Sequence, residues 1–243
     1  MDSPVISSRD NTRIKHISKL LKDKSFRYLQ GEYVIEGLKA VKDSKDIKEI
    51  YLSESAKPVK LEAEKKFFVK DKVFESVSST ENSQGILGVA KMAVRDDSAI
   101  RKDLRYIFLD RVQDPGNMGT IIRTAVAFGI KGIIFLSGTV DPFSPKAVRA
   151  SAGSIGKLDI IKVGDYSSFK GFTLIAADTK GEKLNGFRWP EGFILAIGNE
   201  GAGLSEGILS AAKHRVSIPM PGGVESLNAA VSAGILLYTS LQN

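Results

Sequence analysis

Apolar residues in the first third of the chain follow two different periods. Between residues 12 and 30 they recur at helical spacing with basic residues between them, which predicts one amphipathic helix. The stretch LEAEKKF (61–67) also predicts a helix. Short apolar segments that predict strands are EYVIEG (32–37), IKEIYL (47–52) and ILGVAKM (86–92). The sequence therefore predicts a small α/β domain over residues 1–95.

The pattern changes after a charged segment without aromatic residues at 96–104, which predicts a linker. Beyond it, apolar strands are predicted at YIFLD (106–110), IIFL (133–136), TLIAAD (173–178), FILAIG (193–198) and VSIP (216–219). Helices are predicted over residues 117–128, around 145–153 and over 226–241. This alternation of strands and helices predicts an α/β domain over residues 105–243, with a parallel sheet covered by helices.

Composition limits the class of protein. Of the 243 residues, 42% are hydrophobic and 26% charged, as in globular proteins, which excludes a disordered chain. No apolar run approaches the ~20 residues of a membrane span, and the N-terminus lacks the apolar stretch of a secretory signal. The absence of cysteine excludes disulfide scaffolds and thiolate metal sites. We therefore expect a cytoplasmic protein with no membrane partner and no metal site.

The charge of the chain favours a polyanionic partner. Its net charge is +7, and residues 1–95 carry 19 basic and 14 acidic side chains. A solvated helix face explains such a cluster equally well. The predicted RNA-binding residues at the N-terminus are Arg9, Arg13, Lys15, Lys19 and Arg27.

The first loop to inspect for chemistry follows the strand that ends at Asp110, because ligands bind beyond the carboxyl ends of parallel strands. In DRVQDPGNMGTIIRTAVAFG, Asn117 is placed to cap a helix, and Arg123 lies about two turns into it. Taken alone, Arg123 fits a surface arginine, or an ion pair with Asp110 or Asp114.

Two further loops are rich in glycine. The loop GNEGAGLS (198–205) holds Glu200 between glycines, but the glycine order is not that of a Rossmann turn, and no Walker lysine follows. These features argue against a nicotinamide-dependent dehydrogenase. The loop that opens IPMPGGVESLNAAVSAG (218–234) precedes a helix whose first turn carries Ser226 and Asn228, both of which are common capping residues.

In this order and spacing, the three loops resemble the SPOUT superfamily and, within it, the SpoU/TrmH-type RNA 2'-O-ribose methyltransferases. The resemblance rests on GNMGTIIRTA, GNEGAGLS and IPMPGGVESLNAAVSAG and covers residues 105–241. The N-terminal part is similar, more loosely, to the small substrate-binding domain of many members, which has the fold of RNA-binding ribosomal proteins.

The resemblance implies a deep trefoil knot in the C-terminal sheet and a homodimer formed through the C-terminal domain. It also implies that S-adenosylmethionine is the cofactor. The residues that it assigns to cofactor binding are Gly198, Gly201, Ile218, Met220 and Leu227. The sequence AAVSA after Asn228 departs from many members, which leaves a second polar contact there open.

The resemblance assigns catalysis to Arg123, Asn117, Glu200, Ser226 and Asn228. A guanidinium stays charged near neutral pH, so we expect Arg123 to stabilise the developing 2'-alkoxide rather than to accept its proton. Asn117 and Glu200 are expected to orient Arg123 and its loop. Ser226 and Asn228 are expected to form hydrogen bonds near the ribose or the cofactor.

The substrate class stays open between two RNAs. Ribosomal RNA is favoured because the N-terminal domain resembles a ribosomal-protein fold, and transfer RNA is the alternative within the family. A knotted enzyme that methylates a base atom and a non-catalytic RNA-binding protein of the same fold are further alternatives. The complete set of motif residues argues against a non-catalytic protein.

Overall fold

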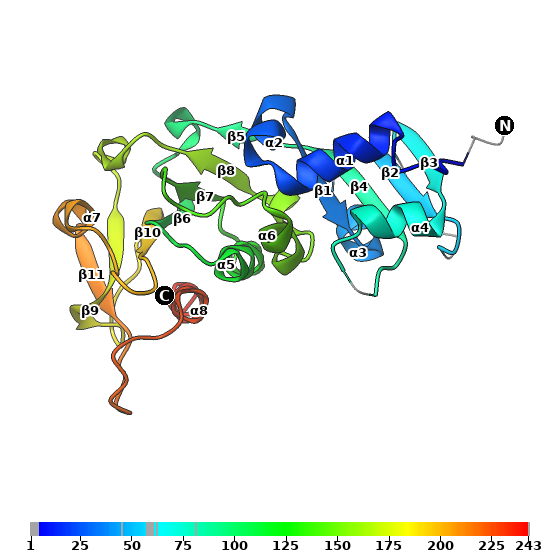
Figure 1. Ribbon diagram of the computed structural model, residues 1–243. Coiled ribbons are helices and arrows are strands. Elements are labelled where there is room, and N and C mark those ends of the chain that lie inside the picture. The colour runs from blue at the N-terminus through cyan, green and yellow to red at the C-terminus, as the bar shows by residue number, and fades with distance from the viewer. Residues whose placement is uncertain (1–4, 45, 57–60, 62, 81, 243) are drawn as a thin grey trace. The chain divides into compact units, whose positions relative to one another are not determined.

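The computed structural model describes residues 5–44, 46–56, 61, 63–80 and 82–242. The chain divides into two compact units with a sheet each (Figure 1). Met1–Ala93 and Phe143–Lys157 form the N-terminal unit, and Val94–Pro142 and Leu158–Asn243 form the C-terminal unit. This division differs from the expected one, because Phe143–Lys157 lies inside the range 105–243.

The N-terminal unit is built on a four-stranded mixed sheet in the order β1-β4-β2-β3. Its strands are β1 (Glu32–Glu36), β2 (Ile47–Ser53), β3 (Lys65–Val69) and β4 (Ile86–Lys91). Its helices are α1 (Thr12–Lys22), α2 (Lys24–Gln30), α3 (Leu38–Asp43), α4 (Asp71–Phe74) and α6 (Pro145–Ala150), with 3₁₀ turns at Glu75–Val77 and Ser154–Lys157. Buried residues of α1 (Ile14, Ile17 and Leu20) pack in one core with strand residues such as Val34 and Leu87.

Two predictions for this unit are wrong. The helix expected over residues 12–30 is broken at Asp23, whose extended backbone ends α1 and whose side chain caps α2 by accepting a hydrogen bond from Phe26 N. The helix expected over 61–67 is replaced by β3, which pairs in parallel with β2. Sheet pairing thus outweighs the helix propensity of Lys65 and Lys66. Residue 62 of that prediction lies outside the described residues.

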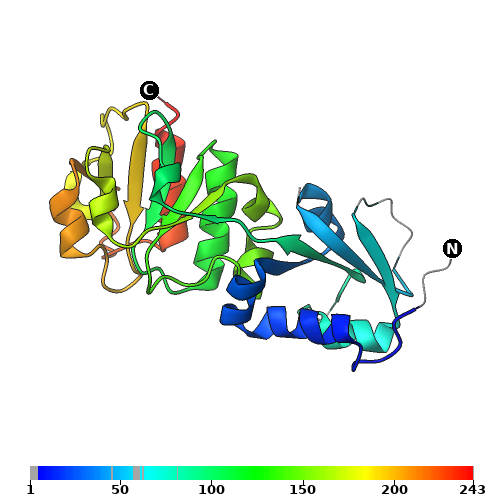
Figure 2. The ribbon, with the colours of Figure 1, turned by 90° about the horizontal axis from the view of Figure 1, so that it is seen from above.

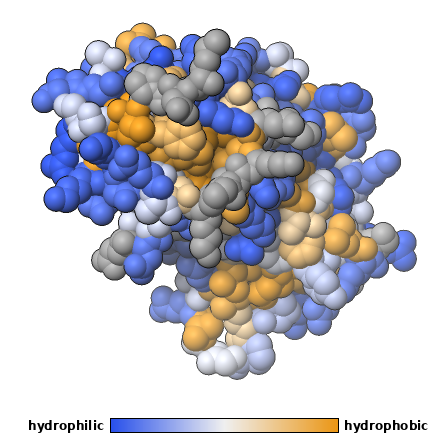
Figure 3. Space-filling view, turned by 90° about the vertical axis from the view of Figure 1, so that its right-hand side faces the viewer, coloured by the Kyte–Doolittle hydropathy of each residue, from blue (hydrophilic) through white to orange (hydrophobic). Residues whose placement is uncertain are grey.

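The segment Phe143–Lys157 belongs to the N-terminal unit through close packing. The Phe143 and Tyr33 rings lie 5.0 Å apart between their centres. A Cβ on Gly153 would lie 2.9 Å from Ala40 Cα, so this position requires glycine. Large apolar side chains that remain exposed in the unit include Val5, Leu29 and Phe68, and Figure 3 shows hydrophobic patches between hydrophilic residues.

The C-terminal unit has the predicted parallel sheet, with seven strands in the order β11-β9-β10-β6-β7-β8-β5. The strands are β5 (Val94–Arg95), β6 (Arg105–Leu109), β7 (Gly132–Phe135), β8 (Asp159–Lys162), β9 (Leu174–Lys183), β10 (Phe193–Ile197) and β11 (His214–Ser217). The helices are α5 (Pro115–Ala127), α7 (Glu206–Ala211) and α8 (Ala229–Thr239), with 3₁₀ turns at Asp97–Ala99 and Tyr166–Phe169.

Helices α5 and α8 pack against each other beside this sheet, as both ribbon views show (Figures 1 and 2). Helix α5 begins with Pro115 after the capping residue Asp114, and α8 begins after Asn228. The expected cap at Asn117 and the expected helix start at Ser226 are therefore wrong, because other side chains accept the first backbone N–H bonds.

The charged segment 96–104 is not a free linker. Val94–Arg95 pairs with β8, and Ile100 is buried in the core of the C-terminal unit. Ala99 and Leu104 pack against the same core, so three apolar side chains of this mainly charged segment contribute to it. Within the described residues no helix is both long and apolar enough to cross a membrane. The trefoil knot stays a prediction.

Candidate active site

Three loops meet at the carboxyl edge of the C-terminal sheet. They follow β6, β10 and β11, and β6 and β10 are parallel neighbours in the sheet. Beside these loops lies a cavity of about 390 Å³, a size typical of small-molecule sites. Its lining includes all five residues predicted to bind the cofactor together with two predicted catalytic residues: Gly198, Gly201, Ile218, Met220, Leu227, Glu200 and Ser226.

The loop after β10 is held by a tight backbone turn. Asn199 and Gly203 exchange two backbone hydrogen bonds of 3.0 Å each. A Cβ on Gly198 would lie 2.3 Å from the carbonyl carbon of Gly203, so no other residue fits there without moving the loop. At Gly201 the nearest atom would be 3.7 Å away. Of these two predicted glycines, only Gly198 is sterically required in this structure.

Glu200 joins this loop to the loop after β6. Its carboxylate accepts hydrogen bonds from Gln113 N (3.2 Å), Asp114 N (3.3 Å) and Asn117 Nδ2 (2.9 Å). Burial opposes ionisation, but these hydrogen bonds outweigh it and lower the pKa of Glu200. Glu200 is therefore a carboxylate at neutral pH, and its charge holds the start of α5.

The third loop is joined through two asparagines. Asn228 Nδ2 donates to Asn117 Oδ1 at 2.9 Å, while Asn228 Oδ1 accepts bonds from Ala230 N and Val231 N at the start of α8. A continuous chain of hydrogen bonds thus runs from Glu200 through Asn117 to Asn228. The structure brings these three predicted residues together from distant parts of the sequence.

Arg123 lies on an exposed part of α5. Within the described part of the chain its side chain forms no hydrogen bond and no ion pair, so the ion pairs considered with Asp110 and Asp114 are absent. The expected contact by which Asn117 or Glu200 would orient Arg123 is also absent from this structure. Arg123 is a charged group available for a ligand.

Sequence reasoning missed a second connection between the loops. Asp110, 1% exposed, accepts hydrogen bonds from Ser205 N (2.6 Å) and Arg111 Nε (3.1 Å). Asn199 Nδ2 donates to Arg111 O at 2.9 Å, and Arg111 has a left-handed backbone with φ of 58°. The sequence signal for this connection was the position of Asp110 at the end of an apolar strand, because a carboxylate buried there needs hydrogen-bond partners.

The predicted RNA-binding residues fall into two groups. Arg9, Lys15 and Lys19 are exposed. Arg13 is paired with Glu49 at 2.6 Å, and Arg27 is only 4% exposed and donates to Leu20 O. The prediction for Arg27 is wrong, because its helical position faces the core and its guanidinium holds a backbone carbonyl.

The described residues contain no cluster of three or more His, Asp or Glu side chains suited to a metal ion. The charged side chains that line the cavity are all acidic (Asp178, Glu200 and Glu225), and the other lining residues are apolar, polar or glycine. The cavity offers backbone and apolar contacts to a small molecule, while Arg123 is exposed on α5 and is not among the described residues that line it.

Comparison with known proteins agrees with this geometry. Residues 105–238 match the SpoU rRNA Methylase family, and residues 11–88 match the MRM3-like substrate binding domain. A Bacillus subtilis protein named 23S rRNA (guanosine(2553)-2'-O)-methyltransferase RlmP is 32% identical, over 96% of this chain and 97% of its own length.

Two solved structures are similar over nearly the whole chain. The AdoMet-bound rRNA methyltransferase from Sinorhizobium meliloti has a TM-score of 0.86 and 28% identity, covering 98% of this chain and 97% of its own. The SpoU methyltransferase AviRb from Streptomyces viridochromogenes, in complex with AdoMet, has a TM-score of 0.84 and 26% identity, covering 96% and 97%. With its three loop motifs in place, the chain belongs to the SpoU rRNA methylase family.

Proposed function

We propose that this protein transfers a methyl group from S-adenosylmethionine to the 2'-hydroxyl of a ribose in ribosomal RNA. The observation that carries the proposal is the hydrogen-bonded chain Glu200–Asn117–Asn228 beside a cavity lined by every predicted cofactor residue. Two relatives, from Bacillus subtilis and Streptomyces viridochromogenes, are named as 23S rRNA 2'-O-methyltransferases, which supports both the reaction and the RNA class.

The cavity fits this cofactor chemically. Ile218, Met220 and Leu227 offer apolar surface for an adenine ring, and the backbone of the loop 198–203 offers polar groups at close range because of its glycines. When bound, S-adenosylmethionine supplies an electrophilic methyl group. The protein has to hold the ribose hydroxyl in line with that group and to ease loss of its proton.

We assign that second task to Arg123. Its guanidinium stays protonated at neutral pH, so it stabilises the developing alkoxide or an adjacent phosphate instead of accepting a proton. Asn117, Glu200 and Asn228 act as positioning residues, since they hold the loops to one another. Ser226, which lines the cavity and is exposed, is assigned to hydrogen bonding with the ribose or the cofactor.

The N-terminal unit is proposed to bind the RNA substrate. Its match to a substrate-binding domain supports this assignment, and its exposed Arg9, Lys15 and Lys19 are available for phosphate contacts. Such contacts predict binding that weakens steeply with salt. We place the reaction in the cytoplasm because the similar rRNA methyltransferases come from bacteria, whose ribosomes lie in that compartment.

A homodimer formed through α8 is also proposed. Val231 and Tyr238 on this helix and Leu241 just after it are each at least 50% exposed. The Tyr238 ring also contacts Phe128 at the end of α5, with 6.3 Å between ring centres. Apolar surface of this kind is stabilised by burial against a partner, and two-fold pairing is the commonest solution.

The test uses methyl-labelled S-adenosylmethionine with unmodified bacterial ribosomal and transfer RNA in separate reactions. After digestion to nucleosides, mass spectrometry identifies the methylated atom. We expect label on a ribose of ribosomal RNA, and a loss of at least a hundredfold in rate for Arg123→Ala with unchanged cofactor affinity. Arg188→Ala, which removes another exposed arginine of the same unit, is the matched control.

Label on transfer RNA alone would show that transfer RNA, and not ribosomal RNA, is the substrate. Label on a base atom, or wild-type turnover in Arg123→Ala, would overturn the reaction or the assignment of Arg123. Cofactor binding without transfer to either RNA would support the non-catalytic alternative.

A further inference from the structure

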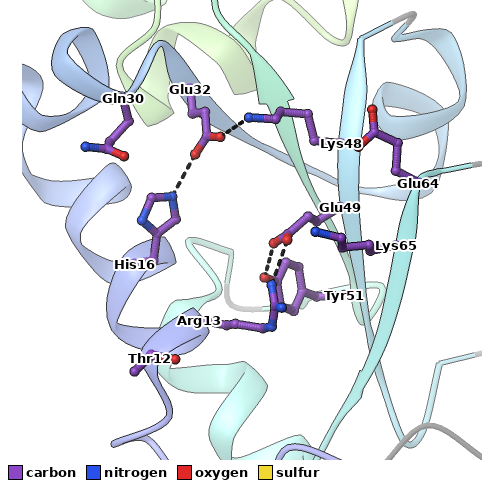
Figure 4. A pocket seen from close by; sticks show the side chains of 10 residues that line it. All are labelled: Thr12, Arg13, His16, Gln30, Glu32, Lys48, Glu49, Tyr51, Glu64 and Lys65. Atoms are coloured by element: carbon purple, nitrogen blue, oxygen red, sulfur yellow. Dashed lines mark hydrogen bonds and ion pairs between the residues drawn. The ribbon is translucent and has the colours of Figure 1, made fainter.

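A second cavity, of about 420 Å³, lies within the N-terminal unit, away from the three motif loops (Figure 4). It is formed by residues of α1, β1 and β2, by the last residue of α2, and by Glu64 and Lys65 at the start of β3. Its lining is almost entirely polar: Thr12, Arg13, His16, Gln30, Glu32, Lys48, Glu49, Tyr51, Glu64 and Lys65. The methyl-transfer site proposed above uses none of these residues.

One side of the cavity is organised by Glu32. Its carboxylate contacts His16 Nε2 at 2.7 Å through one oxygen and Lys48 Nζ through the other, as Figure 4 shows. The Glu32 side chain is 13% exposed. Burial disfavours the charged form, but the bonds from Lys48 and His16 outweigh it and lower the pKa of Glu32. A fixed negative charge therefore lies at this wall.

The other side is organised by Glu49. Arg13 Nη1 donates to one of its oxygens at 2.6 Å, and the Tyr51 hydroxyl donates to the other. The Arg13 guanidinium also stacks over the Phe67 ring, 4.1 Å from its centre. Both its charge and its plane are held in place. Arg13, predicted from sequence to meet phosphate, is thus built into the wall of this cavity.

The two carboxylates retain capacity to accept hydrogen bonds. An ionised carboxylate has about four acceptor positions, and the protein uses one on each oxygen of Glu32 and Glu49. The cations Lys48 and Arg13 lie next to these carboxylates, because each donates to one of them. The cavity therefore suits a planar ligand whose edge presents donors and acceptors next to each other, as the edge of a nucleobase does.

We propose that this cavity binds an unpaired guanine of the RNA substrate. Guanine places two N–H donors, N1–H and N2–H, in a fork that matches one carboxylate, and its O6 and N7 acceptors match arginine or lysine. Uracil has one donor on that edge, and adenine and cytosine carry only an amino group. Bases of single-stranded loops are read in this way, by their edges and by stacking.

The charge balance argues for a base rather than a phosphate in the interior. Three cations (Arg13, Lys48 and Lys65) face three carboxylates (Glu32, Glu49 and Glu64) around the cavity. A phosphate would be repelled by the fixed carboxylates, whereas a base with both kinds of polar group would not. The exposed Lys65 at the start of β3 is left to contact the sugar-phosphate backbone.

This inference rests on the proposed function, since it takes RNA as the ligand, and the test measures binding without methyl transfer. Three nine-nucleotide oligouridines carry uridine, guanosine or inosine at the centre. Fluorescence anisotropy at constant salt gives their affinities for the whole protein. We expect guanosine to bind about tenfold more tightly than uridine, and inosine, which lacks the N2 amino group, to lose most of that gain.

The variants Glu49→Gln and Glu32→Gln keep the size of the side chain and remove its charge. At least one of them should abolish the difference between guanosine and inosine, while Glu54→Gln, an exposed residue of the same unit outside the cavity, should keep it. Should either cavity variant fail to fold, the Gln30 side-chain amide in the wild-type NMR spectrum should shift with guanosine monophosphate and not with uridine monophosphate.

Equal affinity for the three oligonucleotides would overturn the proposal, as would discrimination that survives in both cavity variants. A lost guanosine preference with intact methylation of ribosomal RNA leaves the proposed function standing. A retained preference in a protein that methylates no RNA leaves the cavity assignment standing instead.

Discussion

The two cavities of this protein are built in opposite ways. The cavity of the C-terminal unit is formed mainly by loops together with residues of β9, α7 and α8, and glycine backbone and apolar side chains lie at its wall. The cavity of the N-terminal unit is formed mostly by charged and polar side chains that project from two helices and three strands. The shape of the first cavity depends on close backbone packing at glycine, and the shape of the second depends on which charged side chains are paired.

This difference explains why one cavity was found from the sequence and the other was not. A loop that needs Gly198 carries its requirement within a few consecutive residues, and such a pattern is visible. Arg13, Glu32 and Glu49 belong to three separate elements and alternate there with core residues. Each alone reads as an ordinary solvated charge, and only the fold shows that they are paired.

The largest effect on cofactor affinity is expected where close backbone packing determines the shape of the site. In Gly198→Ala the new Cβ overlaps the backbone at Gly203, so the loop has to move away from the cavity. We expect cofactor affinity to fall at least a hundredfold by isothermal titration calorimetry. Gly201→Ala, which has room for a methyl group, is the matched control and should stay within about threefold of wild type. Equal losses in both variants would contradict the steric difference.

A smaller effect is expected where a charge holds that backbone in place. Glu200→Gln keeps one oxygen acceptor but places an amide group against backbone N–H donors. Cofactor affinity should fall about three- to tenfold, as for loss of one or two charge-assisted bonds. Glu191→Gln, an exposed glutamate of the same unit, should show no change.

The same variant gives a pH dependence with a defined sign. The pKa of Glu200 is lowered in the folded protein, so its contribution is complete above the ordinary glutamate range and is lost as pH falls through the lowered value. Wild-type affinity should decline toward that of Glu200→Gln at acid pH, while the variant changes less. Curves that stay parallel would show that the carboxylate is not the group responsible.

The smallest effect is expected on the stability of the N-terminal unit. Glu32 likewise has a lowered pKa, and the stability it contributes should be lost as pH falls below the ordinary glutamate range. Hydrogen exchange of α1 peptides should therefore increase more in wild type than in Glu32→Gln between pH 5 and pH 3, after correction for intrinsic rates. Glu54→Gln should follow wild type. An identical response of wild type and Glu32→Gln would mean that these bonds contribute nothing to the unit.

The fold could be predicted from the sequence wherever the residues of a segment alone indicate how that segment is buried. The strands at 106–110 and 193–198 are continuous apolar runs because both faces of a parallel sheet are covered, and both predictions are confirmed. The prediction for the segment of β3 was wrong, because Lys65 and Lys66 are exposed residues that form a strand only through pairing with β2. Strand β8 was not predicted, because only Ile160 and Ile161 form an apolar pair there, between Asp159 and Lys162.

For the candidate site, the residues of the motifs could be predicted, but the contacts between distant residues could not. The motif spacing identified Glu200, Asn117 and Asn228, which the structure joins by hydrogen bonds. It could not reveal that Asp110 joins two of the loops from a buried position, because that bond links residues far apart in the chain. Nor could it separate the exposed Lys19 from the buried Arg27, since helical phase changes at the break after α1.

The packing of Phe143–Lys157 with the N-terminal unit has a consequence for biosynthesis. A ribosome adding ~5–20 residues per second needs several seconds to proceed from Ala93 to Lys157. Until then the nascent N-terminal unit lacks the side chain that covers Tyr33 and the backbone that packs on Ala40. Strands β6 and β7 are synthesised during this interval, so the unit encoded first waits to complete its core while the second has already begun to emerge.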